Sequence, residues 1–160
     1  MKANRILVIG GAGFIGRHLV ARLSADNRRV TVPVRRLERA RHLLPLPTVL
    51  VQPVNIADDQ VLDSLLAQCD AVINLAGILH DSFGEPYGRA FANTHVELPR
   101  RLVRACEANG VRRLMHVSAL GVPNERLGEA PSMYLRSKAD GEQAVRNSRL
   151  DWTILRPSVV

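Results

Sequence analysis

The hydrophobic positions of the chain alternate between two periods along its 160 residues. Between short apolar runs, hydrophobic residues recur three or four positions apart, as at Ile15, Leu19 and Leu23, and this spacing indicates amphipathic helices. The apolar runs that predict strands are 6–9, 30–34, 49–51, 71–75, 113–117 and 153–155. Strands and helices that alternate in this way predict an α/β protein, a doubly wound parallel sheet with helices on both faces.

Two prolines modify this prediction. Pro33 lies inside the second predicted strand. Because the centre of a buried strand needs every backbone N–H, we expect that strand to end at Pro33. Pro99 lies in the long helical stretch after the fourth strand, where it should kink the helix or mark its true start.

A glycine turn connects the first predicted strand to the first predicted helix. It reads Gly10-Gly11-Ala12-Gly13-Phe14-Ile15-Gly16. Glycines let the backbone adopt positive φ and approach a ligand closely, and the helix that follows directs the positive end of its dipole at an anion. With a strand before it and a helix after it, the turn predicts a site for the pyrophosphate of a dinucleotide. A tight turn without a ligand is the alternative.

Length and composition bound the class of protein. The chain is long enough for one domain with a real core. Its 4% of aromatic residues argues against the stacking platforms of nucleic-acid binders, and no apolar run reaches the roughly 18 residues of a membrane-spanning helix. Cys69 and Cys106 lack metal-binding spacing, as do His80, His95 and His116. We therefore expect a cytoplasmic protein without a metal site and without a transmembrane segment.

The formal net charge of +7 comes from an excess of arginine, with only two lysines in the chain. A basic balance favours anionic partners in general. The sequence contains no helix-turn-helix, RNA-binding sheet motif or basic arm. We therefore expect no nucleic-acid partner; the alternative, a nucleic-acid binder, would show steeply salt-dependent binding.

Tyr134 and Lys138 are the second feature with chemical meaning. Residues four apart share one face of a helix, so the phenol and the ammonium can converge on one point. A nearby cation favours the phenolate and lowers a tyrosine pKa from about 10 towards the range of a general acid or base. Lys138 is the only lysine apart from Lys2, which strengthens the pairing. The alternative is a surface lysine that lies over an apolar helix.

Five motifs, in this order and spacing, resemble the extended and atypical short-chain dehydrogenase/reductase superfamily, whose members have a Rossmann fold. They are Gly10-x-x-Gly13-x-x-Gly16, Asn74-Leu75-Ala76-Gly77, Val117-Ser118, Tyr134-x-x-x-Lys138 and Leu155-Arg156-Pro157. Segments 116–121 and 134–142 are most similar to one branch. That branch contains bacterial NAD(P)-dependent epimerase/dehydratase-like proteins and the NAD(P)H-binding accessory subunit of respiratory complex I. The resemblance covers the whole chain and implies one NAD(P)-binding Rossmann domain over residues 1–160.

The resemblance implies a role for each matching residue. Tyr134 would be the catalytic acid/base, and Lys138 would bind the nicotinamide ribose and lower the pKa of the tyrosine. Ala76 and Gly77 would flank the adenosine side of the cofactor, and Pro157 would begin the segment that contacts the nicotinamide. The residues of the turn that would hold the pyrophosphate are Gly10, Ala12, Gly13, Phe14, Ile15 and Gly16.

Two departures from the family pattern concern the adenosine end. Members that prefer NAD carry an acidic residue after the second strand, where this chain has Arg35 and Arg36. Because a guanidinium can pair with a phosphate through two hydrogen bonds, the sequence favours NADP(H), with NAD as the alternative. In the alternative interpretation, the two arginines are only solvent-exposed residues at the end of the strand. Asn55 and Ile56 replace the usual aspartate after the third strand, and an amide can still read an adenine edge because it donates and accepts.

The serine of the family's Ser/Tyr/Lys set is the third departure. Extended members often carry two neighbouring hydroxyl residues after the fifth strand, whereas Ser118 is followed by Ala119 and Leu120. Ser118 either polarises the carbonyl of a substrate or only closes a hydrogen bond of the loop. Ser132 is the other candidate.

The sequence stops at Val160, where a substrate-binding portion of comparable length follows in the family. We expect this C-terminal substrate portion to be absent here, together with the residues that select a substrate.

Two functions remain open. The first is an NAD(P)-dependent oxidoreductase or epimerase/dehydratase that moves a hydride to or from a hydroxyl or carbonyl carbon, with Tyr134 as acid/base and an unidentified small-molecule substrate. The second is a non-catalytic NADP(H)-binding subunit or assembly factor of a respiratory complex, which would place the chain in an oligomer or larger complex. The Tyr134 and Lys138 pair favours the first.

Overall fold

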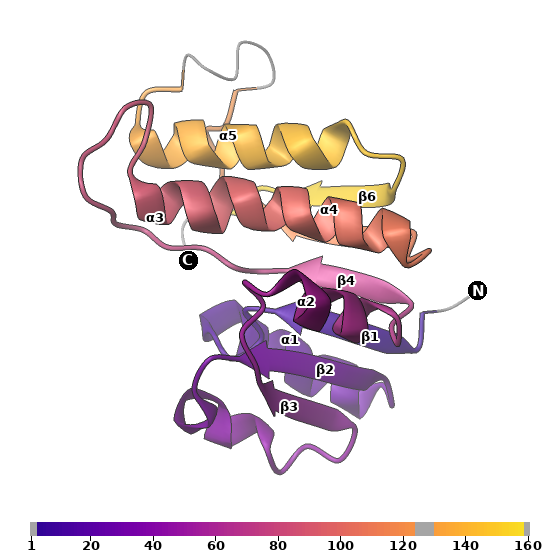
Figure 1. Ribbon diagram of the computed structural model, residues 1–160. Helices are drawn as coiled ribbons and strands as arrows, with labels where there is room; N and C mark the ends of the chain where they lie inside the picture. Colours follow the sequence, from indigo (N-terminus) through magenta and orange to yellow (C-terminus); the bar gives the residue numbers. More distant parts are fainter. Residues whose placement is uncertain (1–2, 124–129, 159–160) are drawn as a thin grey trace.

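Six parallel strands form the centre of the molecule (Figure 1) in the computed structural model, which describes residues 3–123 and 130–158. The strands are β1 (Arg5–Ile9), β2 (Arg29–Val34), β3 (Val49–Pro53), β4 (Ala71–Asn74), β5 (Arg113–Val117) and β6 (Asp151–Leu155). The helices are α1 (Phe14–Ala25), the 3₁₀ helix η1 (Leu37–Leu43), α2 (Asp59–Leu66), α3 (Arg89–Phe91), the π-helical η2 (Ala92–Glu97), α4 (Leu98–Ala108) and α5 (Met133–Arg146). All six predicted strands are present, so the predicted parallel α/β sheet is confirmed.

The order of the strands across the sheet is β3-β2-β1-β4-β5-β6. The chain runs outward from β1 through β2 to β3, and then returns to place β4 on the other side of β1. The connections after β1 and β4 therefore leave in opposite directions beyond the carboxyl ends of these two strands. Ligands of doubly wound sheets bind at such a reversal of the strand order.

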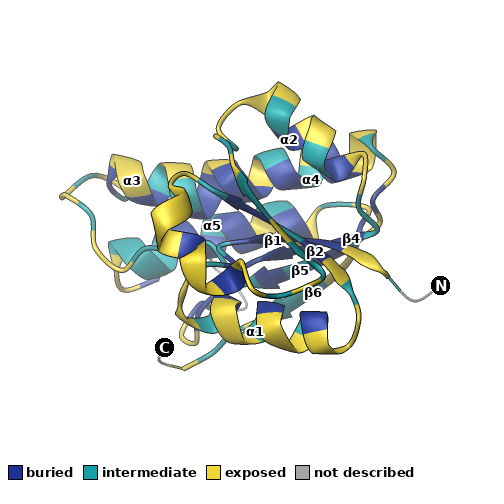
Figure 2. Cartoon of the chain, turned by 90° about the horizontal axis from the view of Figure 1, so that it is seen from below, coloured by how far each residue is buried: buried dark blue, intermediate teal, exposed yellow. Residues whose placement is uncertain are grey.

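Helices cover the sheet on both faces, as Figure 2 shows with α1 on one side and α2 and α4 on the other. Alternate residues of β1 point to opposite faces. Leu7 and Ile9 pack in the cluster that includes residues of α2, α4 and α5, whereas Ile6 and Val8 pack in the cluster that includes residues of α1 and η1. The two apolar clusters hold β1 rigidly, and with it the glycine turn at its end.

The prediction that β2 ends at Pro33 is wrong, because β2 continues to Val34. The N–H of Arg29 points toward β1 and that of Val30 points toward β3. Since this direction alternates along a strand, the N–H that Pro33 lacks would point toward β1. The pairing of β2 with β1 ends at Thr31, so Pro33 removes no hydrogen bond of the sheet.

The prediction for Pro99 is confirmed, because it lies in the first turn of α4, which begins at Leu98. The preceding turn, η2, is π-helical and carries His95. Its backbone lies directly against α5, since a Cβ at Gly141 would collide with the carbonyl oxygen of His95. A glycine is therefore required where these two helices meet.

Candidate functional site

The glycine turn after β1 has the shape that phosphate binding needs. Gly10 has a φ of +77°, and its carbonyl oxygen accepts a hydrogen bond from the N–H of Gly13 at 3.0 Å. A Cβ at Gly16 would collide with that same oxygen, so α1 can pack this closely only with glycine there. No side chain caps the N-terminus of α1 at Gly13. The first N–H groups of α1 are therefore available to an anion.

The residues of this turn differ in exposure. Phe14 is 65% exposed, and the guanidinium of Arg17 lies 5.2 Å from the centre of its ring. Ala12 and Ile15 are half-buried, and Ala12 packs against the cluster beneath α1. The turn thus brings the predicted residues together, although their contacts with a cofactor stay a prediction.

The segment after β4 lies against the glycine turn. A Cβ at Gly10 would come within 3.0 Å of the backbone of Leu75 and Ala76. Asn74 holds this segment, because its Oδ1 accepts from the N–H of Ala76 and its Nδ2 lies 3.1 Å from Nδ1 of His116. Ala76 and Gly77 therefore lie beside the turn, where the adenosine side was predicted.

Gly77 connects this segment to the helix that carries Tyr134 and Lys138. A Cβ at Gly77 would lie 3.3 Å from Nζ of Lys138 and 3.8 Å from Nε2 of His95. A larger residue would therefore fill the space in front of the ammonium group. The structure brings the β1 turn, the β4 segment and α5 together at one edge of the sheet.

Tyr134 and Lys138 lie on one face of α5, as predicted. Ser132 caps this helix, because its hydroxyl accepts from the N–H of Leu135 at 3.2 Å. Nζ of Lys138 lies 5.9 Å from the centre of the Tyr134 ring and donates to the carbonyl oxygen of Val117 at 3.2 Å. Ser132 thus has a structural role, and Lys138 is a buried residue with 4% exposure, so it does not lie on the surface.

Burial dominates the electrostatics of Tyr134 and Lys138. Burial lowers the pKa of Lys138 to about 8, although attraction to Glu142 opposes that shift. Burial raises the pKa of Tyr134 above its ordinary value. That Lys138 lowers the pKa of the tyrosine when a cofactor is bound stays a prediction. The ammonium is bonded to a backbone carbonyl, and desolvation of the phenol dominates.

His95 belongs to the site although its sequence context gave no signal for it. Its Nε2 accepts from the N–H of Ile78 at 3.1 Å, so its Nδ1 carries the hydrogen and donates to Oγ of Ser137 at 2.8 Å. Ser137 in turn donates to the carbonyl oxygen of Tyr134 at 2.8 Å. The ring is 1% exposed and lies 5.5 Å from the Tyr134 ring, nearly perpendicular to it.

A neutral imidazole is what this network requires. Burial, together with the charge of Lys138, lowers the pKa of His95 to about 3. His95 therefore acts as a fixed spacer between the β4 segment and α5. Its partner Ser137 lies 42 residues away in the sequence, so no local sequence pattern indicates this role of His95.

At the adenosine end, Arg35 and Arg36 are exposed and follow β2 at its carboxyl end. Their side chains form no hydrogen bond or ion pair within residues 3–123 and 130–158. Oδ1 of Asn55 accepts from the N–H of Ala57 at 3.1 Å, and its second lone pair and its amide hydrogens remain for a ligand. The carbonyl oxygen of Ile56 accepts from Arg101. The arginines are thus available to a phosphate, and the adenine contact of Asn55 and Ile56 stays a prediction.

The segments after β5 and β6 run side by side. The N–H of Leu120 donates to the carbonyl oxygen of Pro157 at 2.9 Å, and the N–H of Ser118 donates to that of Leu155 at 2.8 Å. Ser118 is 3% exposed, and its buried hydroxyl, close to Glu142, has no hydrogen-bond partner among the described residues. Ser118 therefore lies near Glu142, about two helical turns along α5 from Tyr134. A catalytic role for Ser118 stays a prediction.

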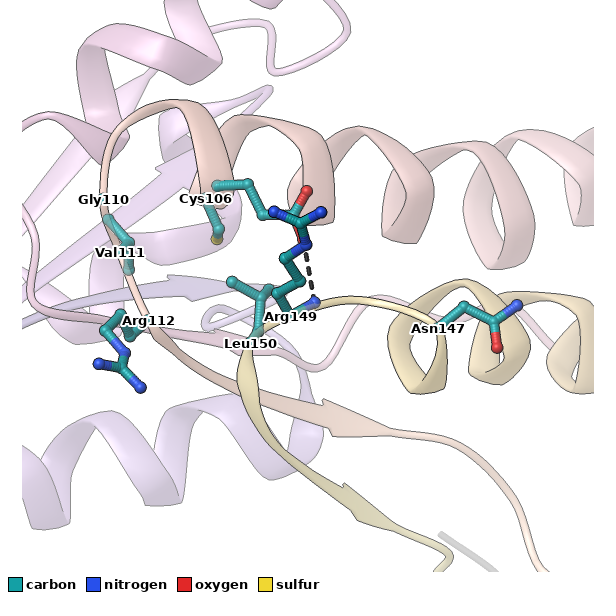
Figure 3. Close-up of a pocket in the computed structure, with 8 residues that line it drawn as sticks. Cys106, Gly110, Val111, Arg112, Asn147, Arg149 and Leu150 are labelled. Carbon is teal, nitrogen blue, oxygen red and sulfur yellow. Dashed lines mark hydrogen bonds between the residues drawn. The ribbon is translucent and has the colours of Figure 1, made fainter.

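A cavity of about 460 Å³ lies at the other end of the sheet, where β5 and β6 begin. Figure 3 shows its lining between the ends of α4 and α5, with the N–H of Arg149 bonded to Glu107. None of the predicted site residues lines it. In the part of the chain that the structure describes, no helix is long and apolar enough to cross a membrane, and no three His, Cys, Asp or Glu residues gather as a metal site.

Residues 10–160 match a family of NAD(P)H-binding domains. Among curated proteins, the mitochondrial NADH dehydrogenase [ubiquinone] 1 alpha subcomplex subunit 9 of Arabidopsis thaliana is 34% identical over 157 residues, which cover 96% of this chain and 37% of that protein. The N-acetyl-alpha-D-glucosaminyl-diphospho-ditrans,octacis-undecaprenol 4-epimerase of Escherichia coli O157:H7 is 27% identical over 172 residues, which cover 98% of this chain and 49% of that protein. The chain thus spans less than half the length of either relative.

Solved structures show the same fold. The UDP-glucuronic acid 4-epimerase of Bacillus cereus in complex with NAD superposes with a TM-score of 0.75 at 22% identity, over 97% of this chain and 57% of that one. A short-chain dehydrogenase/reductase of Veillonella parvula in complex with NADP gives 0.75 at 20% identity, over 97% and 69%. The family match over residues 10–160 shows that the chain belongs to the family of NAD(P)H-binding domains, and the strand order and glycine turn agree with this.

Proposed function

We propose that the chain binds NADP(H) in preference to NAD(H), with the 2′-phosphate of the adenosine at Arg35 and Arg36. The observation that supports this is the pair of exposed guanidinium groups after β2, beside the glycine turn, with no acidic residue at the same place. Arginine pairs with phosphate through two charged hydrogen bonds. No side chain caps the N-terminus of α1, so its first N–H groups can bind a pyrophosphate and the residues present fit the cofactor.

Calorimetric titration with NADPH and NADH tests the preference. Arg35→Asp removes a charged hydrogen bond and adds repulsion, so we expect the affinity for NADPH to fall by about 10- to 100-fold and that for NADH to stay unchanged. Arg22→Asp makes the same change of charge at an exposed position in the last turn of α1 and serves as the matched control. Equal binding of the two cofactors by the unaltered chain would remove the 2′-phosphate argument.

We further propose that Tyr134 is the acid/base of a hydride transfer to or from a hydroxyl or carbonyl carbon. Bound NAD(P)(H) supplies or accepts the hydride. Tyr134 then donates its phenolic proton to the carbonyl oxygen as the alcohol forms, and takes the proton back in the reverse direction. Lys138 is close enough to hold a ribose hydroxyl in front of Gly77 and to stabilise the phenolate. These two residues on one face of α5 support an oxidoreductase or epimerase/dehydratase.

Tyr134→Phe in the full-length protein tests the acid/base role. It removes only the hydroxyl and keeps the ring against His95, so folding and NADPH affinity should be retained. We expect turnover with the cofactor to fall by about 100-fold or more, as for the loss of a general acid/base. Tyr87→Phe is the matched control: its hydroxyl, bonded to Asp140 on the same helix, lies outside the predicted set. Unchanged turnover in Tyr134→Phe would contradict the proposal.

The second candidate function is a non-catalytic NADP(H)-binding subunit of a larger complex. It is supported by the 34% identity to a protein named as a subunit of NADH dehydrogenase and by the raised pKa of Tyr134, which disfavours proton transfer near neutral pH. Purified protein that retains NADPH and oxidises it with no carbonyl compound would favour this candidate. That relative is named as mitochondrial, and a cytoplasmic location for this chain stays a prediction.

A further inference from the structure

A buried ion pair fastens the segment after β6 to α5. Glu142 lies one turn after Lys138 on the same face of α5, and its side chain is 0% exposed. Arg156 follows β6 and binds both oxygens of this carboxylate, Nε to Oε1 at 2.7 Å and Nη2 to Oε2 at 2.7 Å. Arg146, on α5 itself, adds weaker contacts at 3.3 Å from the surface. None of the roles considered above uses this pair.

The cost of burying the pair indicates a positional role. Burial raises the pKa of Glu142, but the hydrogen bonds and charge of Arg156 act against this effect and the net shift is a lowering, so the carboxyl is ionised. A buried ion pair adds little stability compared with apolar side chains of the same size. The two parallel hydrogen bonds do fix the orientation of Arg156 relative to Glu142, which an apolar contact would not do.

The pair of Glu142 and Arg156 holds the segment after β6, which lies beside the segment after β5. Arg156 directly precedes Pro157, whose carbonyl oxygen accepts from Leu120 in the segment after β5. Lys138 binds the end of β5 through the carbonyl oxygen of Val117. Successive turns of α5 thus hold the ends of β5 and β6, and Figure 1 shows α5 and β6 side by side.

We propose that Glu142 is a positioning residue of the cofactor site, which holds Pro157 and the segment after β6 in place for the nicotinamide end through its two-pronged pair with Arg156. This inference rests on the proposed cofactor binding. It also gives Glu142 a second effect, since Glu142 is the negative group beside Lys138. The other titratable groups that face Lys138 are Tyr134 on α5, His95 on η2 and His116 on β5.

Two ligands separate the nicotinamide end from the adenosine end. NADPH spans both, whereas adenosine 2′,5′-bisphosphate occupies only the adenosine side. In Glu142→Gln we expect the dissociation constant of NADPH to rise about tenfold and that of the bisphosphate to stay the same, by calorimetry on the full chain. Arg146→Gln is the matched control, since it removes a partner of the same carboxylate without releasing the segment after β6.

The pH dependence of the NADPH affinity distinguishes this role from a packing defect, because loss of packing alone would not shift it. The affinity should fall as Lys138 loses its proton, and removal of the Glu142 charge should shift the midpoint of that fall to lower pH. The shift should be absent in Arg146→Gln.

A third variant guards against misfolding. If loss of the Glu142 charge prevents Glu142→Gln from folding, the double variant Glu142→Met/Arg156→Met removes both charges together. It should show the same selective loss for NADPH. A folded variant that binds NADPH normally, or that loses both ligands equally, would overturn the inference. An unaltered chain that binds neither ligand would instead overturn the proposed function.

Discussion

At the scale of single residues, two buried histidines show how surroundings set chemistry. His95 and His116 are 1% and 2% exposed, and each binds a partner that requires a neutral ring. Burial is the main cause that lowers the pKa of His95 to about 3 and that of His116 to about 4. In the unfolded chain both return to about 6.5. Below this pH the unfolded chain therefore binds two protons, one on each histidine, that the folded protein does not bind.

The free energy of unfolding should consequently fall as the pH is lowered from about 7 to 5. Each histidine contributes a slope of up to about 1.4 kcal/mol per pH unit, because the unfolded state binds the extra proton. Urea denaturation at pH 7, 6 and 5 measures it. His95→Gln should remove one part of the slope. An equal slope in His95→Gln and the unaltered chain would show that His95 is not held neutral.

At the scale of elements, the site depends on how closely η2 and α5 approach. The π-helical turn η2 presents His95 to Tyr134 and Ser137, and a Cβ at Gly141 would strike the carbonyl oxygen of His95. π-Helical turns are frequent at functional sites. The apolar periodicity predicts a helix over this region, but it carries no information about the π-turn or the distance to α5.

Gly141→Ala should therefore reverse the usual effect of alanine in a helix. Alanine normally stabilises a helix interior by about 1 kcal/mol over glycine, whereas here overpacking should destabilise the fold by about 1–3 kcal/mol. Thermal unfolding measures the change. Gln143→Ala, on the exposed face of α5, should be close to neutral. A stabilised Gly141→Ala would mean that η2 and α5 can separate freely.

At the scale of the whole molecule, the charge is divided unevenly along the chain. Residues 1–57 contain ten Lys and Arg against two Asp and Glu, whereas residues 58–160 contain twelve against thirteen. The basic part includes the glycine turn and Arg35 and Arg36. Its field should attract a phosphate-rich ligand toward the half of the sheet that was predicted to hold the adenosine.

The same scale separates what a sequence can predict from what it cannot. The six strands, their parallel sheet and the position of Tyr134 and Lys138 on one helix face follow from local patterns. The end assigned to β2 was wrong, because the direction in which Pro33 would point its N–H depends on where pairing with β1 stops. His95 and Glu142 were missed because their partners are distant in sequence, or identifiable only once burial is known.

The hydrogen bonds around His95 all run one way, from the N–H of Ile78 to the ring, then to Ser137, then to the backbone of Tyr134. Both ring nitrogens are occupied, so the imidazole has no lone pair left to receive a proton from the phenol. His95 therefore cannot accept a proton from Tyr134, whereas a catalytic histidine would transfer one. Any proton that Tyr134 exchanges must therefore leave on another side of the phenol, past Lys138 or directly into solvent.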